Sequence, residues 1–107
     1  MGDAGARSSS SVGQVADAVV DALAPLGPVR WKAMFGGAGI FVDDRMFGLV
    51  DSQARLFFKV GDGNRAQFDA AGSVQHSRMP YFSVPDGVLA DVAALLDWAR
   101  ASAELTR

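Results

Sequence analysis

Four short stretches in which apolar and polar residues alternate, joined by loops of at most five residues, dominate the first half of the chain. They cover residues 29–35, 38–43, 46–50 and 55–60. Alternation with a period of two is typical of β-strands. Parallel neighbours need a crossover of about a dozen residues or more, so loops this short allow only antiparallel pairing. The sequence therefore predicts an antiparallel meander.

Glycines mark the first of these loops. The run Met34-Phe35-Gly36-Gly37, followed by Gly39, lies between two apolar stretches. A residue without a side chain lets the backbone reverse, bulge or approach a neighbour closely. We interpret these glycines as architectural and predict a hairpin. A phosphate-binding loop is the alternative, but both glycine spacings that characterise such loops are absent.

Three segments carry apolar residues at steps of three and four, which predicts amphipathic helices. The first begins near residue 11 and ends at Pro25, the second is a short helix through Phe68, and the third follows Asp91. Asp62 or Asn64 is predicted to cap the second helix, and Asp91 the third. The apolar stripe of the last helix is expected at Val92, Leu95, Leu96, Ala99 and Ala103.

A fifth strand is predicted at residues 81–84, between two prolines that favour a strand end or a sheet edge. Residues 1–10 contain no large apolar side chain except Met1, so we expect a flexible tail there and a folded domain over residues 11–107. The predicted fold is α+β: a two-layer domain with an antiparallel meander sheet of about five strands, helices on one face, and the order α-β-β-β-β-α-β-α.

Composition excludes several classes of protein. The chain has 107 residues, half of them hydrophobic, which fits one folded domain. No apolar run approaches the roughly 20 residues of a membrane helix, and no secretory leader is recognisable, so we expect a cytoplasmic protein. Cysteine is absent and His76 is the single histidine, which argues against thiolate chemistry, a histidine metal site and a disulfide framework. We expect no cofactor and no metal.

Charge is unevenly distributed along the chain. The net charge of −2 at pH 7 argues against a dedicated nucleic-acid binder, because phosphate would be attracted weakly. Residues 29–60 nevertheless carry two more basic than acidic side chains. The acid is concentrated in the predicted helices.

Strand alternation predicts one candidate interaction surface on the face of the sheet that the helices leave free: Arg30, Lys32, Arg55, Phe57 and Lys59. With Phe57 as a stacking ring, this basic face resembles a platform for single-stranded nucleic acid. The first and fourth strands of a meander lie about 14 Å apart, at roughly 4.8 Å per spacing. That span suits a polymer or an acidic protein better than one small anion. For Lys59, a solvated lysine that limits aggregation is the alternative.

No catalytic constellation is recognisable. We interpret His76 as a solvent-facing loop residue, because no nucleophile or carboxylate is placed by sequence to form a relay with it. Tyr81 and Trp31 are interpreted as half-buried packing residues, and Asp43-Asp44 as a turn. The sequence therefore predicts a protein that is not an enzyme.

Several separate runs resemble the N-terminal domain of the TfoX/Sxy family. They follow one another in the family's order over about residues 12–103. The resemblance implies an α+β fold with an antiparallel sheet. The runs are Met34 to Gly37, Gly39 to Asp44, Met46 to Val50, Leu56 to Val60, Met79 to Pro85 with Tyr81, and Leu95 to Arg100.

The resemblance also implies a kind of function. The family is named for regulators of natural competence, which promote transcription of DNA-uptake genes. Membership implies a regulatory, protein-interacting domain with a protein partner. The sequence ends at Arg107 and does not contain the C-terminal helical domain of those regulators, so we expect a stand-alone N-terminal-domain protein. Weak nucleic-acid binding stays open as an alternative. An open sheet edge predicts a monomer or a weak homodimer.

Overall fold

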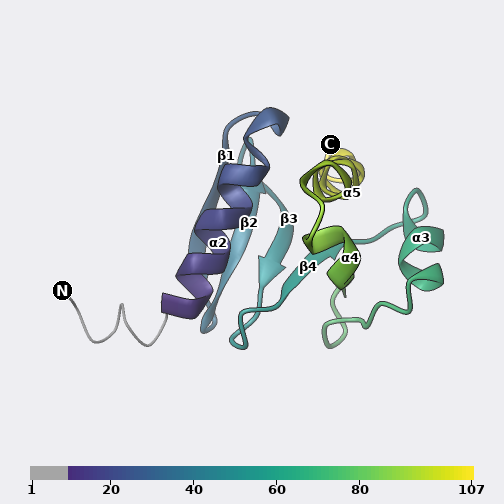
Figure 1. Cartoon of the computed structure of the whole chain (residues 1–107), viewed down its shortest axis with the longest axis horizontal. Coiled ribbons are helices and arrows are strands. Elements are labelled where there is room, and N and C mark those ends of the chain that lie inside the picture. The colour runs from purple at the N-terminus through teal and green to yellow at the C-terminus, as the bar shows by residue number, and fades with distance from the viewer. Residues whose placement is uncertain (1–9) are drawn as a thin grey trace.

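A single antiparallel sheet forms the centre of the domain. The computed structural model describes residues 10–107, so the predicted tail lies outside the described residues except for Ser10, which is already helical. The sheet order is β1-β2-β3-β4-β5, with every neighbouring pair antiparallel. The predicted meander is confirmed (Figure 1). Its strands are β1 Val29–Met34, β2 Gly37–Val42, β3 Arg45–Val50, β4 Leu56–Lys59 and β5 Tyr81–Ser83.

Helices cover one face of this sheet. Helix α2 packs on β1 and β2, and α5 packs on β3 and β4 (Figure 1). The predicted α+β class and element order are confirmed. One short helix, α4, was not predicted, because a single turn is too short to show a helical period. The helices are α2 Ser10–Ala22, the 3-10 helix η1 Ala24–Leu26, α3 Arg65–Ala70, α4 Asp86–Leu89 and α5 Val92–Glu104.

Two-residue turns set the register of the first three strands. Met34 pairs with Gly37, so Phe35 and Gly36 alone form the first turn, with φ values of 50° and 77°. Asp43 and Asp44 form the second turn in the same left-handed region. Such turns match the right-handed twist of a hairpin. The hairpin is confirmed, but the prediction that Phe35 continues the first strand is wrong.

Glycines allow close backbone approach inside the sheet. A Cβ built on Gly37 would lie 2.1 Å from the carbonyl oxygen of Val50. A Cβ on Gly48 would lie 3.2 Å from Phe58. Beside Gly48 the strand β3 has a bulge of one extra residue, because Ile40 pairs with Gly48 while the next residue, Phe41, pairs with Met46. The architectural interpretation of Gly37 is therefore confirmed.

The main core lies between the sheet and the two long helices. Ile40, Phe47 and Phe58 from the sheet meet Leu23 of α2 and Ala99 of α5 there. Burying one large apolar side chain contributes about 1.5–3 kcal/mol, so this layer supplies most of the stabilisation that the fold receives.

One helix cap agrees with the prediction, whereas the other cap and the buried stripe of α5 differ from it. Asp91 caps α5 as predicted, with its carboxylate accepting from the N–H groups of Ala93 and Ala94. Asn64 does not cap α3, because its side chain is buried and makes its hydrogen bonds elsewhere. Val92 lies outside the buried stripe of α5, whereas Ser102 belongs to it. A buried serine interrupts the apolar pattern from which the stripe was read.

Candidate interaction site

Four of the five predicted surface residues lie on β1 and β4 and point away from the helices, whereas Arg55 lies in the loop before β4. Arg30 and Lys32 alternate along β1 with Val29 and Trp31, which contact the main core. On β4, Leu56 and Phe58 belong to the core, which places the alternating side chains on the other face. The two groups are separated by β2 and β3, as the meander order required.

Two of the four cations in this set are neutralised locally. The guanidinium of Arg30 forms an ion pair with Asp44 at 2.6 Å and lies over the ring of Phe41, 5.1 Å from its centre. Arg55 forms an ion pair with Asp51 at 2.9 Å. The basic face therefore carries less available charge than its sequence suggests.

Phe57 is not a stacking ring for a ligand. Its residue is only 4% exposed, and it forms a small second core with Leu49 and Tyr81 on the outer sheet face. The segment between α3 and β5 covers this second core, and the ring of His76 meets Phe57 edge-on at 4.8 Å. The interpretation of Phe57 as a stacking ring is thus wrong, because the ring is covered.

His76 and Tyr81 are both packed against the outer face. The interpretation of His76 as a solvent-facing residue is wrong, because it is half-buried and its Nδ1 atom is buried without a partner among the described residues. Tyr81 is a packing residue but is more deeply buried than expected, at 6% exposure, and its hydroxyl donates to the carbonyl oxygen of Met46 at 3.3 Å. Burial raises the pKa of the Tyr81 phenol.

An apolar pocket lies beside this second core. It encloses about 190 Å³, and Met34 of β1, Met46 of β3 and Met79 of the covering segment contribute to its lining. Gly39 makes room for one wall, since a Cβ there would lie 3.1 Å from the sulfur of Met34. Methionine side chains are flexible and polarisable, so they adapt to apolar partners of different shape.

Phe35 stands at the mouth of this pocket. Its residue is 99% exposed and its φ is 50°, a conformation that a large side chain adopts only at a cost. Asn or Gly at this position would fit a two-residue hairpin turn better than Phe does. An exposed aromatic ring held in an unfavourable backbone conformation favours a role in binding over a role in folding. We call Met34, Phe35, Met46 and Met79 the outer-face patch.

Cations without ion pairs lie around the outer-face patch. Among residues 10–107, Lys32, Lys59 and Arg78 are the basic side chains that form no ion pair within 4.0 Å. Lys32 shares the outer face of β1 with Met34, and Arg78 immediately precedes Met79. Lys59 pairs with Tyr81 across β4 and β5. The patch therefore combines apolar surface with uncompensated positive charge.

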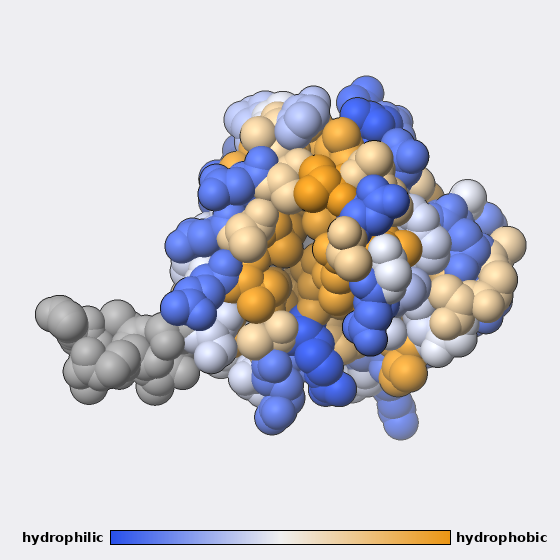
Figure 2. All heavy atoms as spheres, in the orientation of Figure 1, coloured by the Kyte–Doolittle hydropathy of each residue, from blue (hydrophilic) through white to orange (hydrophobic). Residues whose placement is uncertain are grey.

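A larger cavity opens on the helix-covered side. Figure 2 shows apolar side chains gathered in a hollow between α2 and α4. A cavity of about 760 Å³ is lined by Val15, Leu56 and Leu89, among others. Its charged lining residues, Arg55 and Asp86, have opposite signs. This cavity consequently offers volume but no net charge that would select a partner.

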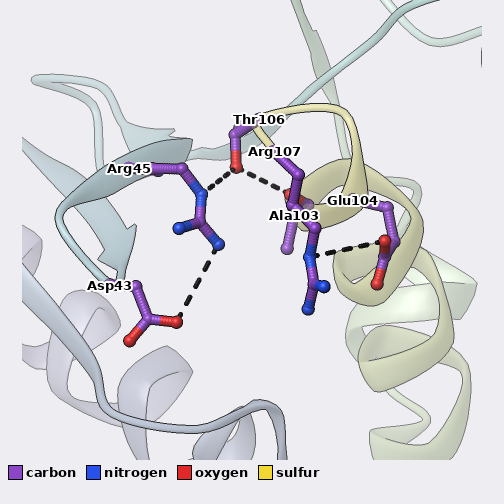
Figure 3. Close-up of polar contacts among 6 residues, drawn as sticks. All are labelled: Asp43, Arg45, Ala103, Glu104, Thr106 and Arg107. Atoms are coloured by element: carbon purple, nitrogen blue, oxygen red, sulfur yellow. Dashed lines mark hydrogen bonds and ion pairs between the residues drawn. The ribbon is translucent and has the colours of Figure 1, made fainter.

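A polar cluster ties the β2–β3 turn to the end of α5 (Figure 3). Arg45 donates from Nε to Oγ1 of Thr106 at 3.1 Å and lies 3.9 Å from the carboxylate of Asp43. Arg107 pairs with Glu104 at 3.5 Å. Each cation in the cluster has an acidic neighbour, so we interpret the cluster as structural.

The comparison with known families agrees with this geometry. Residues 21–105 match the family model of the TfoX N-terminal domain. The chain belongs to the TfoX N-terminal domain family. No curated protein matches it.

The match to the TfoX N-terminal domain takes in all five strands and helices α3 to α5, and it begins near the end of α2. It includes every residue of the outer-face patch and all five predicted surface residues. The resemblance that the sequence motifs indicated is confirmed for the family and for the fold.

The part of this TfoX N-terminal domain that the structure describes holds no group of three or more His, Asp or Glu side chains arranged for a metal ion. No helix within residues 10–107 is long and apolar enough to cross a membrane.

Sequence reasoning missed the outer-face patch. A signal was present, because Met34 and Met46 fall at outer-face positions of the predicted strands, where polar residues were expected. Met79 could not be added from the sequence, since an irregular segment has no period that places its side chains.

Proposed function

We propose that this chain is a non-enzymatic regulatory domain of TfoX type that binds a partner protein through the outer-face patch. The observation that carries this proposal is Phe35, an exposed ring held at positive φ at the mouth of a pocket lined by three methionines. Neither the turn nor the core benefits from this side chain. Exposed apolar surface with a polar rim is characteristic of protein-interaction sites.

The chemistry of the partner follows from the charge around the patch. Lys32, Lys59 and Arg78 have no ion pair among the described residues, so an acidic segment would gain contacts there without displacing an existing acid. An apolar side chain of the partner would fill the pocket of about 190 Å³. The expected ligand is a protein segment with one apolar anchor flanked by acidic residues. Apolar anchors of this kind carry most of the binding energy in interfaces.

Paired capture experiments test this proposal. Extract from the native host is passed over the wild-type chain and over the variant Phe35→Ala with Met79→Ala. Val92→Ala is the matched control, because it removes an exposed apolar side chain from α5 on the helix-covered side. A protein that is retained by the wild type and the control, but lost with the patch variant, is then purified and titrated directly against each.

The expected result is direct binding by the wild type and the control, weakened at least tenfold by the patch variant. Equal retention by all three chains, or no partner at concentrations up to tens of micromolar, contradicts the proposal.

Nucleic-acid binding is the second candidate, favoured by the same three uncompensated cations. The burial of Phe57 removes the stacking ring on which sequence-tolerant binding of single strands depends. What is left is a purely electrostatic attraction, which salt weakens steeply. A gel-shift titration with single-stranded DNA at low salt tests it, and Lys32→Glu with Lys59→Glu is expected to abolish any shift.

A further inference from the structure

The two edges of the sheet differ in whether another segment of the chain pairs with them. The outer edge of β5 is occupied by the segment that covers the outer face. The N–H of His76 donates to the carbonyl oxygen of Tyr81 at 2.8 Å, and the N–H of Ser83 donates to the carbonyl oxygen of Val74 at 2.9 Å. Within residues 10–107 no segment pairs with the outer edge of β1. A sheet edge without a partner is a template for another strand.

The register of the first hairpin shows which groups of β1 are free. Met34 and Gly37 flank a two-residue turn, so they form a hydrogen-bonded pair. Hydrogen-bonded pairs recur at every second residue, so Lys32 and Arg30 each form such a pair with the residue opposite on β2. The alternate residues Trp31 and Ala33 then direct their N–H and C=O groups to the open edge. Neither residue makes a backbone hydrogen bond outside the β1–β2 ladder among the described residues.

Charge argues against a second copy of this chain at the edge. Antiparallel pairing of two β1 strands through the free groups of Trp31 allows three registers. They place Arg30 opposite Arg30, Lys32 opposite Arg30, or Lys32 opposite Lys32. Like charges directly opposite each other destabilise a strand pair. Lys32 has no acidic neighbour that would relieve this repulsion, whereas Arg30 is paired with Asp44. The register with Arg30 opposite Arg30 is disfavoured for another reason: it pairs Trp31 with Val29, whose N–H already donates to the carbonyl oxygen of Gly27 at 2.8 Å.

We propose that β1 binds an extended acidic segment of the partner protein as an additional antiparallel strand. This inference rests on the proposed function and gives it a binding mode. Acidic side chains of the added strand would lie on the same face as Met34 and the outer-face patch. The one opposite Lys32 would meet a cation without an ion pair, and the one opposite Arg30 would share the guanidinium with Asp44. Main-chain hydrogen bonds to Trp31 and Ala33 would supply affinity, and the charges would supply selectivity.

The geometry also determines the pattern of the bound segment. Residues that face Arg30 and Lys32 are acidic and alternate with residues that face Trp31 and Ala33. The latter side chains lie on the helix side, where Trp31 donates from its indole to the carboxylate of Asp17 at 2.8 Å. Small or β-branched residues without negative charge suit those positions. The bound segment therefore alternates acidic with neutral residues.

A labelled probe peptide of alternating Glu and Thr tests the binding mode by fluorescence anisotropy at low salt. In the antiparallel arrangement the Thr residues lie opposite Trp31 and Ala33, so their N–H groups point to β1, whereas the Glu N–H groups point to solvent. Methylation of the Thr nitrogens is expected to weaken binding at least tenfold. Methylation of the Glu nitrogens adds the same bulk and keeps the charge, and is expected to leave binding within twofold.

Two further measurements use the same probe. Lys32→Glu is expected to weaken binding about tenfold, because one attraction becomes a repulsion. In the wild-type chain, hydrogen exchange followed by NMR is expected to show unprotected amides at Trp31 and Ala33, which become protected when the probe binds. Neither result depends on a variant that disturbs the core.

Several outcomes overturn the inference. The inference fails if the probe does not bind, if the two methylated peptides bind equally, or if methylation of the Glu nitrogens alone abolishes binding. It also fails if a single-stranded oligonucleotide binds more tightly than the probe at the same salt concentration. If the capture experiment still finds a partner that depends on Phe35 and Met79, the proposed function stands and the strand-addition mode alone is rejected. If that partner is also missing, both fail.

Discussion

Asn64 and Ser102 donate to the same acceptor, the backbone carbonyl oxygen of Lys59, although they lie 38 residues apart in the sequence. The distances are 3.0 Å from Nδ2 of Asn64 and 2.8 Å from Oγ of Ser102. The side-chain oxygen of Asn64 accepts from the N–H of Gly61 at 2.9 Å. This network joins the end of β4, the turn before α3 and the last turns of α5, and both side chains are buried.

Replacement of Asn64 is expected to destabilise the fold. Asn64→Ala leaves the Gly61 N–H without its acceptor and removes one donor from the Lys59 carbonyl, so the free energy of unfolding should fall by about 2 kcal/mol. Urea denaturation measures it. Asp62→Ala is the control, since Asp62 is exposed and forms no ion pair among the described residues, and it should change stability by less than about 0.5 kcal/mol. Equal effects would mean that the network contributes no stability.

Two glycines are expected to respond in opposite directions to the same substitution. Gly37→Ala places a methyl group 2.1 Å from the carbonyl oxygen of Val50, and because the obstacle is backbone the strands must separate. We expect a loss of about 3 kcal/mol. Gly13→Ala adds a methyl group to α2 with nothing within 4 Å and should raise stability by about 1 kcal/mol. Thermal unfolding of both variants checks the pair. Similar melting temperatures would contradict the close approach at Gly37.

Much of the fold was predictable because its signals are local. Alternation over residues 29–60 and the short loops determine an antiparallel meander, and Asp91 marks the start of α5 through its own side chain. Asn64 was misassigned because its partners, Ser102 above all, are distant in sequence. No local pattern tells an asparagine that caps the next helix from one that turns back to the preceding strand.

The candidate site was predictable only in part. Strand period places Lys32, Arg55 and Lys59 on one face, yet it says nothing about what covers that face. His76 and Met79 belong to an irregular segment, whose path over Phe57 depends on tertiary packing. The same segment buries the ring that was expected to bind nucleic acid. Loops that fold back on a sheet thus limit any prediction of a surface from strand alternation.

Asp51 is expected to make stability depend on acid pH. Its side chain is only 8% exposed, and burial alone would raise the carboxyl pKa. Hydrogen bonds from the N–H and guanidinium of Arg55 and from the N–H of Gln53 outweigh burial, so the pKa lies below its usual range. Because the pKa is lower in the folded state, the ionised carboxylate contributes its full stabilisation at pH values above the unfolded pKa of about 3.9. That contribution is lost as the pH falls through the folded-state pKa.

The measurement compares wild type with Asp51→Asn by urea denaturation from pH 7 down to pH 2. The difference in the free energy of unfolding is expected to be largest above about pH 4.5 and to shrink toward acid pH. A difference that stays constant over the whole range would show that the carboxylate charge has no part in holding the β3–β4 turn. Asp97→Asn is the control, because Asp97 is exposed on α5.

Phe35 is expected to lower the stability of the fold and to strengthen binding of the partner protein. Phe35→Asn creates the Asn-Gly pair that two-residue hairpin turns prefer, and it relieves the positive φ of 50° at an aromatic residue. The free energy of unfolding should rise by about 1 kcal/mol, because this strain costs on the order of 1–3 kcal/mol. The partner captured by the wild type should be lost, because the exposed ring at the mouth of the methionine pocket is gone.

Phe35→Ala separates the two effects. It removes the ring as well, but alanine has little preference for positive φ, so stability should stay within about 0.5 kcal/mol of the wild type while binding falls equally. Chemical denaturation and direct titration of the partner, carried out on both variants, give the four values needed. A loss of stability in Phe35→Asn would refute the strain at this turn, and unchanged partner binding in both variants would remove Phe35 from the interface.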